Sequence, residues 1–225
     1  MREPLVRASG LGRSYTHGST RVEAVRGATF AIHDTDTIAV VGPSGSGKST
    51  LLHLVAGLDR PATGSIDWPA IGDRAALRPG PIGIAFQGPS LLPPLTVLEN
   101  VALPAILAGD TEADASRAAL ELLRSFGAAE LAERLPDELS GGQAQRVGFA
   151  RAFAGSPRLV LADEPTGQLD AIGGAAVMTV ALALAEHRQA ALVVATHDAA
   201  IAGRLDARWV MRDGTLHREA VPSSA

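Results

Sequence analysis

The sequence contains no cysteine among its 225 residues, so it can form neither a disulfide nor a thiolate metal site, and it fits a reducing compartment. It has one tyrosine (Tyr15), one asparagine (Asn100) and one lysine (Lys48), whereas the other nineteen of its twenty Lys and Arg residues are arginine. A general bias that replaces lysine by arginine and asparagine by other residues explains most of this pattern. It does not explain why Lys48 is kept.

Long apolar runs and an excess of positive charge are missing as well. The formal net charge is −4 and the isoelectric point about 5.9, which weighs against a nucleic-acid partner because such proteins usually carry a basic face. The longest weakly apolar stretch, AAVMTVALALA, is shorter than the ~20 residues of a membrane span, and the N-terminus lacks the apolar run of a signal peptide. We therefore expect a chain that does not itself cross a membrane.

Short β-rich runs dominate the first part of the chain. LVRASGL, ATFAI, TIAVVG, GSIDW and IGIAF are typical of strands, and the continuous apolar run TIAVVG indicates a strand buried on both faces. STLLHLVAGL, which follows TIAVVG after a glycine-rich loop, has the apolar spacing of a helix that ends near Gly57.

The apolar period changes at about Thr96. TVLENVALPAILAG, TEADASRAALELLRSFG and AAELAERL (128–135) predict successive helices, with Thr111 and Asp114 resembling a capping box. Strands and helices then alternate again as RLVLAD, DAIGGAAVMTVALALAEHR, AALVVAT and DAAIAGRL, before a hairpin that turns at Asp213-Gly214.

This alternation predicts an α/β fold with a mostly parallel sheet. We expect a single domain over residues 1–225. Its α/β core would comprise residues 1–89 and 158–225, and a helical lobe of about 90–157 would be inserted into it.

The loop GPSGSGKST, residues 42–50, matches the pattern G-x-x-x-x-G-K-[ST] at Gly42, Gly47, Lys48 and Ser49. Glycines allow successive backbone N–H groups to converge on phosphate oxygens, and the following helix directs its positive dipole end to the same place. Lys48 would supply a point charge to the β- and γ-phosphates, and Ser49 a hydroxyl ligand to Mg²⁺. The loop therefore predicts binding of a nucleoside triphosphate.

A second possible anion site is LSGGQ, which opens the helical segment GGQAQRVGFARAF. Ser140 is a natural N-cap, and Gly141 and Gly142 leave the helix N-terminus open to close approach. One phosphate group needs only one phosphate loop, so a second site on another lobe suggests that it clamps the nucleotide of another copy. Read in isolation, the pattern also fits an ordinary capped helix start.

Two carboxylates, Asp163 and Glu164, end the expected strand RLVLAD. The carboxyl ends of strands are where open α/β sheets bind ligands. Asp163 would belong to the Mg²⁺ shell, and Glu164 would orient or deprotonate an attacking water. Two acidic residues that merely end a strand are the alternative interpretation.

The set GPSGSGKST, IAFQ, LSGGQ, LVLADE, GQLD and THD resembles the ATP-binding subunit of an ABC transporter over nearly the whole chain. GLDRPATG, LLPPLTVLENVALP, LADEPTGQLD and VMRDG are similar to the branch that includes lipoprotein-release (LolD-like) and macrolide-exporter (MacB-like) ATPases. The resemblance implies the P-loop NTPase fold of ABC ATPases, with N-terminal antiparallel strands beside the parallel sheet and an inserted helical subdomain.

The resemblance also implies further roles. Tyr15 would stack on adenine, His197 would contact the γ-phosphate, Asp170 would lie at a dimer interface, and Gln87 would bridge Mg²⁺, the attacking water and a membrane partner. The residues expected to act in catalysis are Glu164, His197, Gln87 and Lys48. Those expected to bind metal are Ser49, Gln87 and Asp163. Those expected to bind nucleotide are Tyr15, Gly42, Pro43, Ser44, Gly45, Ser46, Gly47, Lys48, Ser49, Thr50, Ser140, Gly141, Gly142, Gln143 and Asp170.

The function implied is hydrolysis of ATP with Mg²⁺ by two copies paired head to tail around two nucleotides. The pair would drive a separate integral membrane permease, of a MacB/FtsX-like type, from the cytoplasmic inner face of the membrane, without a nucleic-acid partner. The alternative is a soluble ABC ATPase of DNA repair or translation, although the coiled-coil insertion or tandem cassette of such proteins is absent. A P-loop kinase of small molecules would lack LSGGQ, and Glu164 with His197 weighs against a regulatory module without turnover.

The sequence departs from the family pattern in three places. Gln168 stands where the branch usually has asparagine, Ala144 where a polar residue is common, and the segment PAIGDRAALRPGP is shorter than the usual loop. None of these positions is expected to touch a phosphate or the attacking water.

Overall fold

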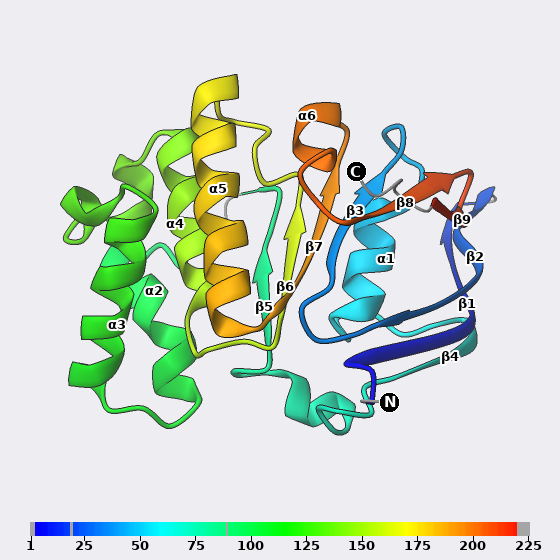
Figure 1. The fold of residues 1–225 in the computed structure, drawn as a ribbon, viewed down its shortest axis with the longest axis horizontal. Coiled ribbons are helices and arrows are strands. Elements are labelled where there is room, and N and C mark those ends of the chain that lie inside the picture. Colours follow the sequence, from blue (N-terminus) through cyan, green and yellow to red (C-terminus); the bar gives the residue numbers. More distant parts are fainter. Residues whose placement is uncertain (1–2, 19, 89, 220–225) are drawn as a thin grey trace, which may run out of the picture. The chain divides into compact units, whose positions relative to one another are not determined.

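The computed structural model describes residues 3–18, 20–88 and 90–219, and it divides the chain into two compact units (Figure 1). Unit 1 joins the residues up to Leu77 with those from Ala191 onward, and unit 2 is Arg78–Ala190. The helical lobe expected at about 90–157 lies inside unit 2, which also contains two strands and a further long helix.

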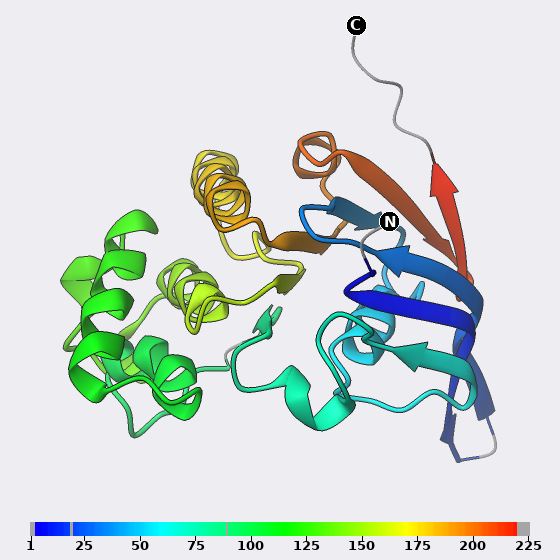
Figure 2. The ribbon, with the colours of Figure 1, turned by 60° about the horizontal axis from the view of Figure 1, so that its bottom comes forward.

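Unit 1 contains two sheets and helix α1 (Figure 2). The first sheet is antiparallel, with the strand order β2-β1-β4. In the second sheet, β3 lies between β7 and β8 and is parallel to both, and β9 pairs with β8 in the antiparallel direction. Helix α1 contacts β2 of the first sheet and β7 of the second. The elements are β1 (Val6–His17), β2 (Thr20–Ile32), β3 (Thr37–Val41), α1 (Lys48–Val55), β4 (Thr63–Asp67), the 3-10 turn η1 (Arg74–Leu77), β7 (Ala191–Thr196), α6 (Ala199–Ala202), β8 (Ala207–Arg212) and β9 (Thr215–Glu219).

Unit 2 packs its helices around α4. Strands β5 and β6 pair in parallel, and α4 contacts both strands as well as α2 and α3. Phe126 stacks on Phe149 of α4 at a ring-centroid distance of 5.7 Å, so aromatic packing fixes this helix in the unit. The elements are β5 (Ile82–Ala85), α2 (Val97–Leu107), α3 (Glu112–Ser125), η2 (Ala129–Leu131), η3 (Pro136–Glu138), α4 (Gly141–Phe153), β6 (Leu159–Asp163) and α5 (Ala171–Arg188).

The α/β fold with a mostly parallel sheet and antiparallel N-terminal strands is confirmed. Strand β3 is almost wholly buried, as its continuous apolar run predicted, and the predicted strands β6 and β7 are buried as well. The final hairpin turns at Asp213 and Gly214, which both have positive φ, so the predicted two-residue turn is also confirmed.

The helix predicted over residues 128–135 is wrong, because only the three-residue 3-10 turn η2 forms there. The carbonyls of Ala132 and Arg134 accept hydrogen bonds from the N–H groups of Leu98 and Val97 at the start of α2. These acceptors are therefore used to complete another helix instead of continuing their own. Pro136 then follows and prevents Leu135 from adopting helical backbone.

The single asparagine, Asn100, lies fully buried in α2. Its side-chain oxygen accepts from the N–H of Leu92, and its nitrogen donates to the carbonyls of Leu92, Leu95 and Thr96 at 2.9–3.1 Å. One side chain thus supplies the hydrogen bonds that a loop without secondary structure needs, and both a donor and an acceptor are required for this.

Helix α3 begins at the predicted cap. The hydroxyl of Thr111 accepts from the N–H of Asp114 at 3.2 Å and donates to its carboxylate at 2.7 Å. The carboxylate therefore bonds the hydroxyl of the cap, not its backbone N–H as in a full capping box.

None of the helices in the part of the chain that the structure describes combines the length and the hydropathy of a membrane span.

Candidate functional site

The loop of residues 42–47 connects buried strand β3 to helix α1 in unit 1. The helix begins at Lys48, and the residue before it, Gly47, has φ of 103° and provides no side-chain cap. The residue before the helix therefore supplies no side-chain acceptor to the first N–H groups of α1. Together with the helix dipole, they make this helix end suited to an anion.

Two glycines of this loop are required by close approach of other backbone segments. A Cβ on Gly47 would lie 2.0 Å from the carbonyl oxygen of Ala24 in β2, and one on Gly42 would lie 2.3 Å from that of Met211 in β8. In addition, the N–H of Gly214 donates to the carbonyl of Ser46 at 3.2 Å. The loop is thus held in shape by unit 1 itself.

Lys48 is buried, with 7% of its surface exposed, and its ammonium donates to the carbonyls of Gly42 (2.9 Å) and Pro43 (3.3 Å). The hydroxyl of Ser46 is also buried and makes no hydrogen bond within the described residues. A compact ammonium, an unsatisfied hydroxyl and an uncapped helix end within one short loop fit a phosphate group.

Tyr15, the predicted adenine contact, lies near the end of β1 and is 40% exposed. Its hydroxyl donates to the carboxylate of Asp59 at 2.7 Å, and the guanidinium of Arg13 lies 4.7 Å from its ring centroid. Arg13 also pairs with Asp59 at 2.8 Å. The three side chains hold the ring in one orientation, with a cation over one of its faces.

The same contacts act on the acidity of Asp59. Partial desolvation would raise its pKa, but the hydrogen bonds from Tyr15 and from the N–H of Arg60, together with the charge of Arg13, outweigh it. The pKa of Asp59 is therefore lowered from its ordinary value, and the carboxylate stays ionised at neutral pH.

His197 is exposed directly after β7, also in unit 1. Its two neighbours fix the backbone, because the N–H of Asp198 donates to the hydroxyl of Thr196 at 3.0 Å and the carboxylate of Asp198 caps α6. Unit 1 thus contains three groups of predicted site residues, namely Tyr15, residues 42–50 and His197.

Unit 2 contains the predicted acidic pair at the end of β6. Asp163 and Glu164 are both buried, with exposed fractions of 6% and 9%. Glu164 has φ of 46°, a left-handed conformation that is uncommon for a residue other than glycine, and β-carbon sterics make it costly. The chain therefore turns sharply at this carboxylate.

Helix α4 starts at the predicted cap. The hydroxyl of Ser140 accepts from the N–H of Gln143 at 3.3 Å, and the side chain of Gln143 accepts from the N–H of Ser140 at 2.8 Å. This is a complete capping box, confirming the helix start that LSGGQ predicted.

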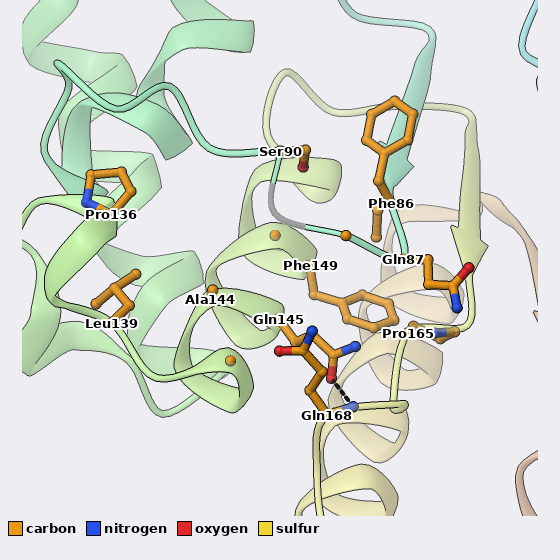
Figure 3. Close-up of a pocket in the computed structure, with 14 residues that line it drawn as sticks. Phe86, Gln87, Ser90, Pro136, Leu139, Ala144, Gln145, Phe149, Pro165 and Gln168 are labelled. Atoms are coloured by element: carbon orange, nitrogen blue, oxygen red, sulfur yellow. Dashed lines mark hydrogen bonds between the residues drawn. The ribbon is translucent and has the colours of Figure 1, made fainter.

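The segment that follows Glu164 lies against the start of α4 (Figure 3). A Cβ on Gly141 would lie 1.8 Å from the side-chain oxygen of Gln168, and one on Gly142 would lie 2.9 Å from Leu169. Both glycines therefore let the side chains of Gln168 and Leu169 lie in their present positions against α4. Asp170, next along, caps α5 by accepting from the N–H of Gly173 at 2.8 Å.

Gln87 is exposed just after β5 and lines a pocket of about 240 Å³ in unit 2 (Figure 3). The same pocket is lined by residues of α4 and by Gln168. Arg151 of α4 donates to the carbonyl of Ser90 at 2.6 Å, which ties the segment after Gln87 to this helix. Burial lowers the pKa of Arg151, since desolvation disfavours its charge.

Among the described residues, no three His, Cys, Asp or Glu side chains gather closely enough to hold a metal ion by themselves. The predicted metal ligands offer one carboxylate, one hydroxyl and one amide oxygen. All three are hard oxygen donors of the kind that Mg²⁺ takes when nucleotide phosphates complete its shell.

Several residues that shape the site were not predicted from the sequence. They are Arg13 and Asp59, which hold Tyr15, Gln145 of α4, which contacts the turn after Glu164, and Arg151. Of these residues, only Gln145 could have been found from the sequence, because it lies two residues beyond LSGGQ in the predicted helix.

Comparison with known proteins gives a consistent result. Residues 25–167 match the family model described as ABC transporter. The chain is 42% identical over 224 residues to the lipoprotein-releasing system ATP-binding protein LolD of Legionella pneumophila (strain Paris), covering 96% of this chain and 99% of that one. It is 39% identical to the LolD protein of Idiomarina loihiensis, over 97% of this chain and 99% of that one.

Solved structures with the same fold are ABC transporter cassettes. The dimeric structure of MJ0796, a bacterial ABC transporter cassette, is similar with a TM-score of 0.90 and 32% identity, over 97% of this chain and all of the other. A dimeric post-hydrolysis state of MJ0796 bound to ADP and Pi is similar with a TM-score of 0.89 and 33% identity, with the same coverage.

Proposed function

Because the chain belongs to the ABC transporter family and is an ATP-hydrolysing subunit of that family, we propose that two copies work together around two ATP molecules to drive a separate membrane permease. The observation that carries the proposal is the loop of residues 42–47, in which a buried ammonium adjoins an uncapped helix end. No other described helix of eight residues or more starts without a side-chain cap.

In unit 1, residues 42–50 bind the phosphates of ATP. Backbone N–H groups of the loop and the start of α1 donate to phosphate oxygens, and Lys48 exchanges one or both of its carbonyl partners for them. Tyr15 stacks on the base. Arg13 lies over one face of its ring and Asp59 accepts a hydrogen bond from its hydroxyl, so the other face stays available for stacking. His197 contacts the γ-phosphate.

Hydrolysis requires a base for water and a cation on the phosphates. Glu164 orients or deprotonates the attacking water, as its burial at the end of β6 favours. Ser49, Asp163 and Gln87 would hold Mg²⁺, which supplies charge neutralisation on the phosphate oxygens.

The dimer is proposed because a second helix end, at Ser140–Gln143, has the composition of an anion site but belongs to unit 2. In the head-to-tail arrangement each ATP lies between residues 42–50 of one copy and Ser140–Gln143 of the other, and Asp170 lies at the interface. The dimeric structures of the MJ0796 cassette support the pairing of two copies. Binding closes the pair because contacts to the γ-phosphate exist only in the closed state.

The permease partner places this subunit on the cytoplasmic face of the membrane. The LolD relatives favour a permease of the lipoprotein-releasing kind over the MacB/FtsX-like type expected from the sequence. Leu91 and Leu92 are candidate contacts with it, since Leu92 is 43% exposed beside the pocket at Gln87. Replacing both leucines by serine should weaken assembly with the permease, and wild-type assembly and coupling would contradict this role.

The proposal is tested with Glu164→Gln in the full chain. ATP binding should persist and an ATP-dependent dimer should accumulate in size-exclusion chromatography, while turnover falls by about 10²–10⁴-fold, the usual contribution of a general base. Glu121→Gln, the same change on the exposed face of α3, is the matched control and should hydrolyse ATP like the wild type. Undiminished turnover in Glu164→Gln would refute the assignment of the base.

A second measurement addresses the partner. Capture through a tag on the wild-type subunit should recover a protein with several membrane spans. Recovery of ribosomes or DNA-repair proteins instead would overturn the transport function and favour a soluble ABC ATPase.

A further inference from the structure

Gln145 on α4 makes two hydrogen bonds to the segment that follows β6. Its side-chain oxygen accepts from the N–H of Gln168 at 3.0 Å (Figure 3). Its side-chain nitrogen donates to the carbonyl of Glu164 at 3.4 Å. Both partners are backbone groups, 19 and 23 positions away along the chain. A single carboxamide thus spans the turn between them.

The turn that Gln145 spans carries Glu164 in its left-handed conformation. Two further hydrogen bonds lie within the turn. The N–H of Gly167 donates to the carbonyl of Glu164 at 3.2 Å, and the N–H of Leu169 donates to the carbonyl of Thr166 at 3.0 Å. A left-handed non-glycine residue persists only where its surroundings over-determine the backbone. The bonds from Gln145 attach both ends of this turn to α4.

The contact is also sterically specific. Gly141 and Gly142 allow Gln168 and Leu169 to lie directly against the first turn of α4, and a Cβ at Gly141 would displace the end of the Gln168 side chain. Gln145 is one turn further along this helix, so hydrogen bonds and close packing act on the same segment. The start of α4 and the turn of residues 164–169 are therefore joined at several points within unit 2.

We propose that Gln145 is a positioning residue for hydrolysis, whose carboxamide holds the turn of residues 164–169 so that Glu164 faces the attacking water. This rests on the proposed function, because it assumes that Glu164 acts on that water. Gln145 itself touches neither ATP nor water. It acts through the backbone of Glu164, and a loss of its bonds lowers the rate of the chemical step and leaves nucleotide binding unchanged.

The test is Gln145→Asn in the full chain, compared with Gln189→Asn. The first change shortens the carboxamide by one methylene, so it no longer reaches both Glu164 and Gln168. The second makes the same chemical change at the exposed end of α5, where asparagine tolerates the left-handed backbone of Gln189. Gln145→Asn should lower kcat about tenfold or more with KM for ATP unchanged, while Tm falls only by about 2–4 °C, as for the loss of one hydrogen bond. Gln189→Asn should match the wild type.

A second variant isolates the donor. Gln145→Glu keeps the length of the side chain and its acceptor for Gln168 but removes the N–H that donates to Glu164. It should also lower kcat without raising KM, and it covers the case in which Gln145→Asn fails to fold. Wild-type kcat in Gln145→Glu would show that hydrolysis does not depend on the hydrogen bond to Glu164. Wild-type kcat in both variants would overturn the proposal.

Coupling to Glu164 is measured with a double variant. If Gln145 acts through Glu164, then Gln145→Asn should change the residual turnover of Glu164→Gln by less than twofold, because the effect of the two residues is shared. A full tenfold further loss would show an independent role and contradict the proposal. Absence of hydrolysis by the wild-type chain would instead refute the proposed function, so the two failures are distinguishable.

Discussion

Two helix starts in this protein, those of α1 and α4, have the composition of anion sites but are built in different ways. Helix α1 follows Gly47, which leaves its N–H groups without a side-chain cap, and backbone carbonyls of β2 and β8 close around the loop. Helix α4 follows Ser140, whose capping box with Gln143 already satisfies two N–H groups. The first end is open and rigid, whereas the second is occupied in part by its own side chains.

The difference indicates a division of work. The start of α1 has its geometry fixed by unit 1 alone, so under the proposed function it would hold a nucleotide before any partner arrives. The start of α4 depends on side chains of unit 2, those of Gln168 and Leu169 among them. It therefore suits a contact that forms later and responds to the conformation of the turn at Glu164.

The largest effect is expected at α1. Lys48→Arg should abolish hydrolysis, because a planar guanidinium is wider than the ammonium that fits between the carbonyls of Gly42 and Pro43. Steady-state turnover measures this, and Arg117→Lys on the exposed face of α3 is the reverse control, expected to match the wild type. Near-normal turnover in Lys48→Arg would break the claim that the loop around α1 is rigid.

The next largest effect is expected from glycine substitutions at the two helix starts, which should differ in whether a second substitution restores turnover. Gly141→Ala should lower turnover moderately, since its Cβ would lie 1.8 Å from the side-chain oxygen of Gln168 and would displace that side chain. Adding Gln168→Ala removes this obstacle and should restore most of the loss. Gly47→Ala meets the backbone carbonyl of Ala24 at 2.0 Å, so no truncation of a side chain can rescue it.

The rescue is measured as the turnover of the double variant relative to Gln168→Ala alone. If Gly141→Ala stays impaired in that background, then the glycine serves a contact outside its own chain, and the dependence of α4 on residues 168–169 is wrong.

The smallest effect concerns the caps. Ser140→Ala removes an N-cap and should destabilise the protein by about 1 kcal/mol, which lowers Tm by roughly 2–4 °C for a chain of this size. Thr111→Ala removes the cap of α3 and should cost a similar amount in the same thermal melt, with turnover unchanged. If Ser140→Ala changes turnover no more than Thr111→Ala does, then Ser140 has no role beyond capping its helix.

Much of the fold could be predicted because its signals are local. Continuous apolar runs predicted buried strands such as β3, and the change of period at Thr96 predicted α2 and α3. Residues 128–135 were predicted wrongly because their carbonyls bond to α2, some 35 positions earlier along the chain, and helical periodicity carries no information on such a competitor.

The site shows the same limit. Residues 42–50 and Ser140–Gln143 were recognisable because their chemistry depends on spacing within one short stretch. Asp59 and Gln145 were not, since each acts on a group far along the chain: Asp59 on Tyr15, and Gln145 on the backbone of Glu164. What the sequence could not provide is which distant backbone each polar side chain reaches.

The scarcity of lysine has a practical consequence for handling this protein. Apart from the amine at the start of the chain, Lys48 carries its only primary amine, and that amine is buried in the loop of residues 42–47. Acylating reagents that normally decorate a protein surface therefore have a single internal target. Their rate of reaction, followed by mass spectrometry, becomes a direct gauge of how often that loop opens and of what fills it.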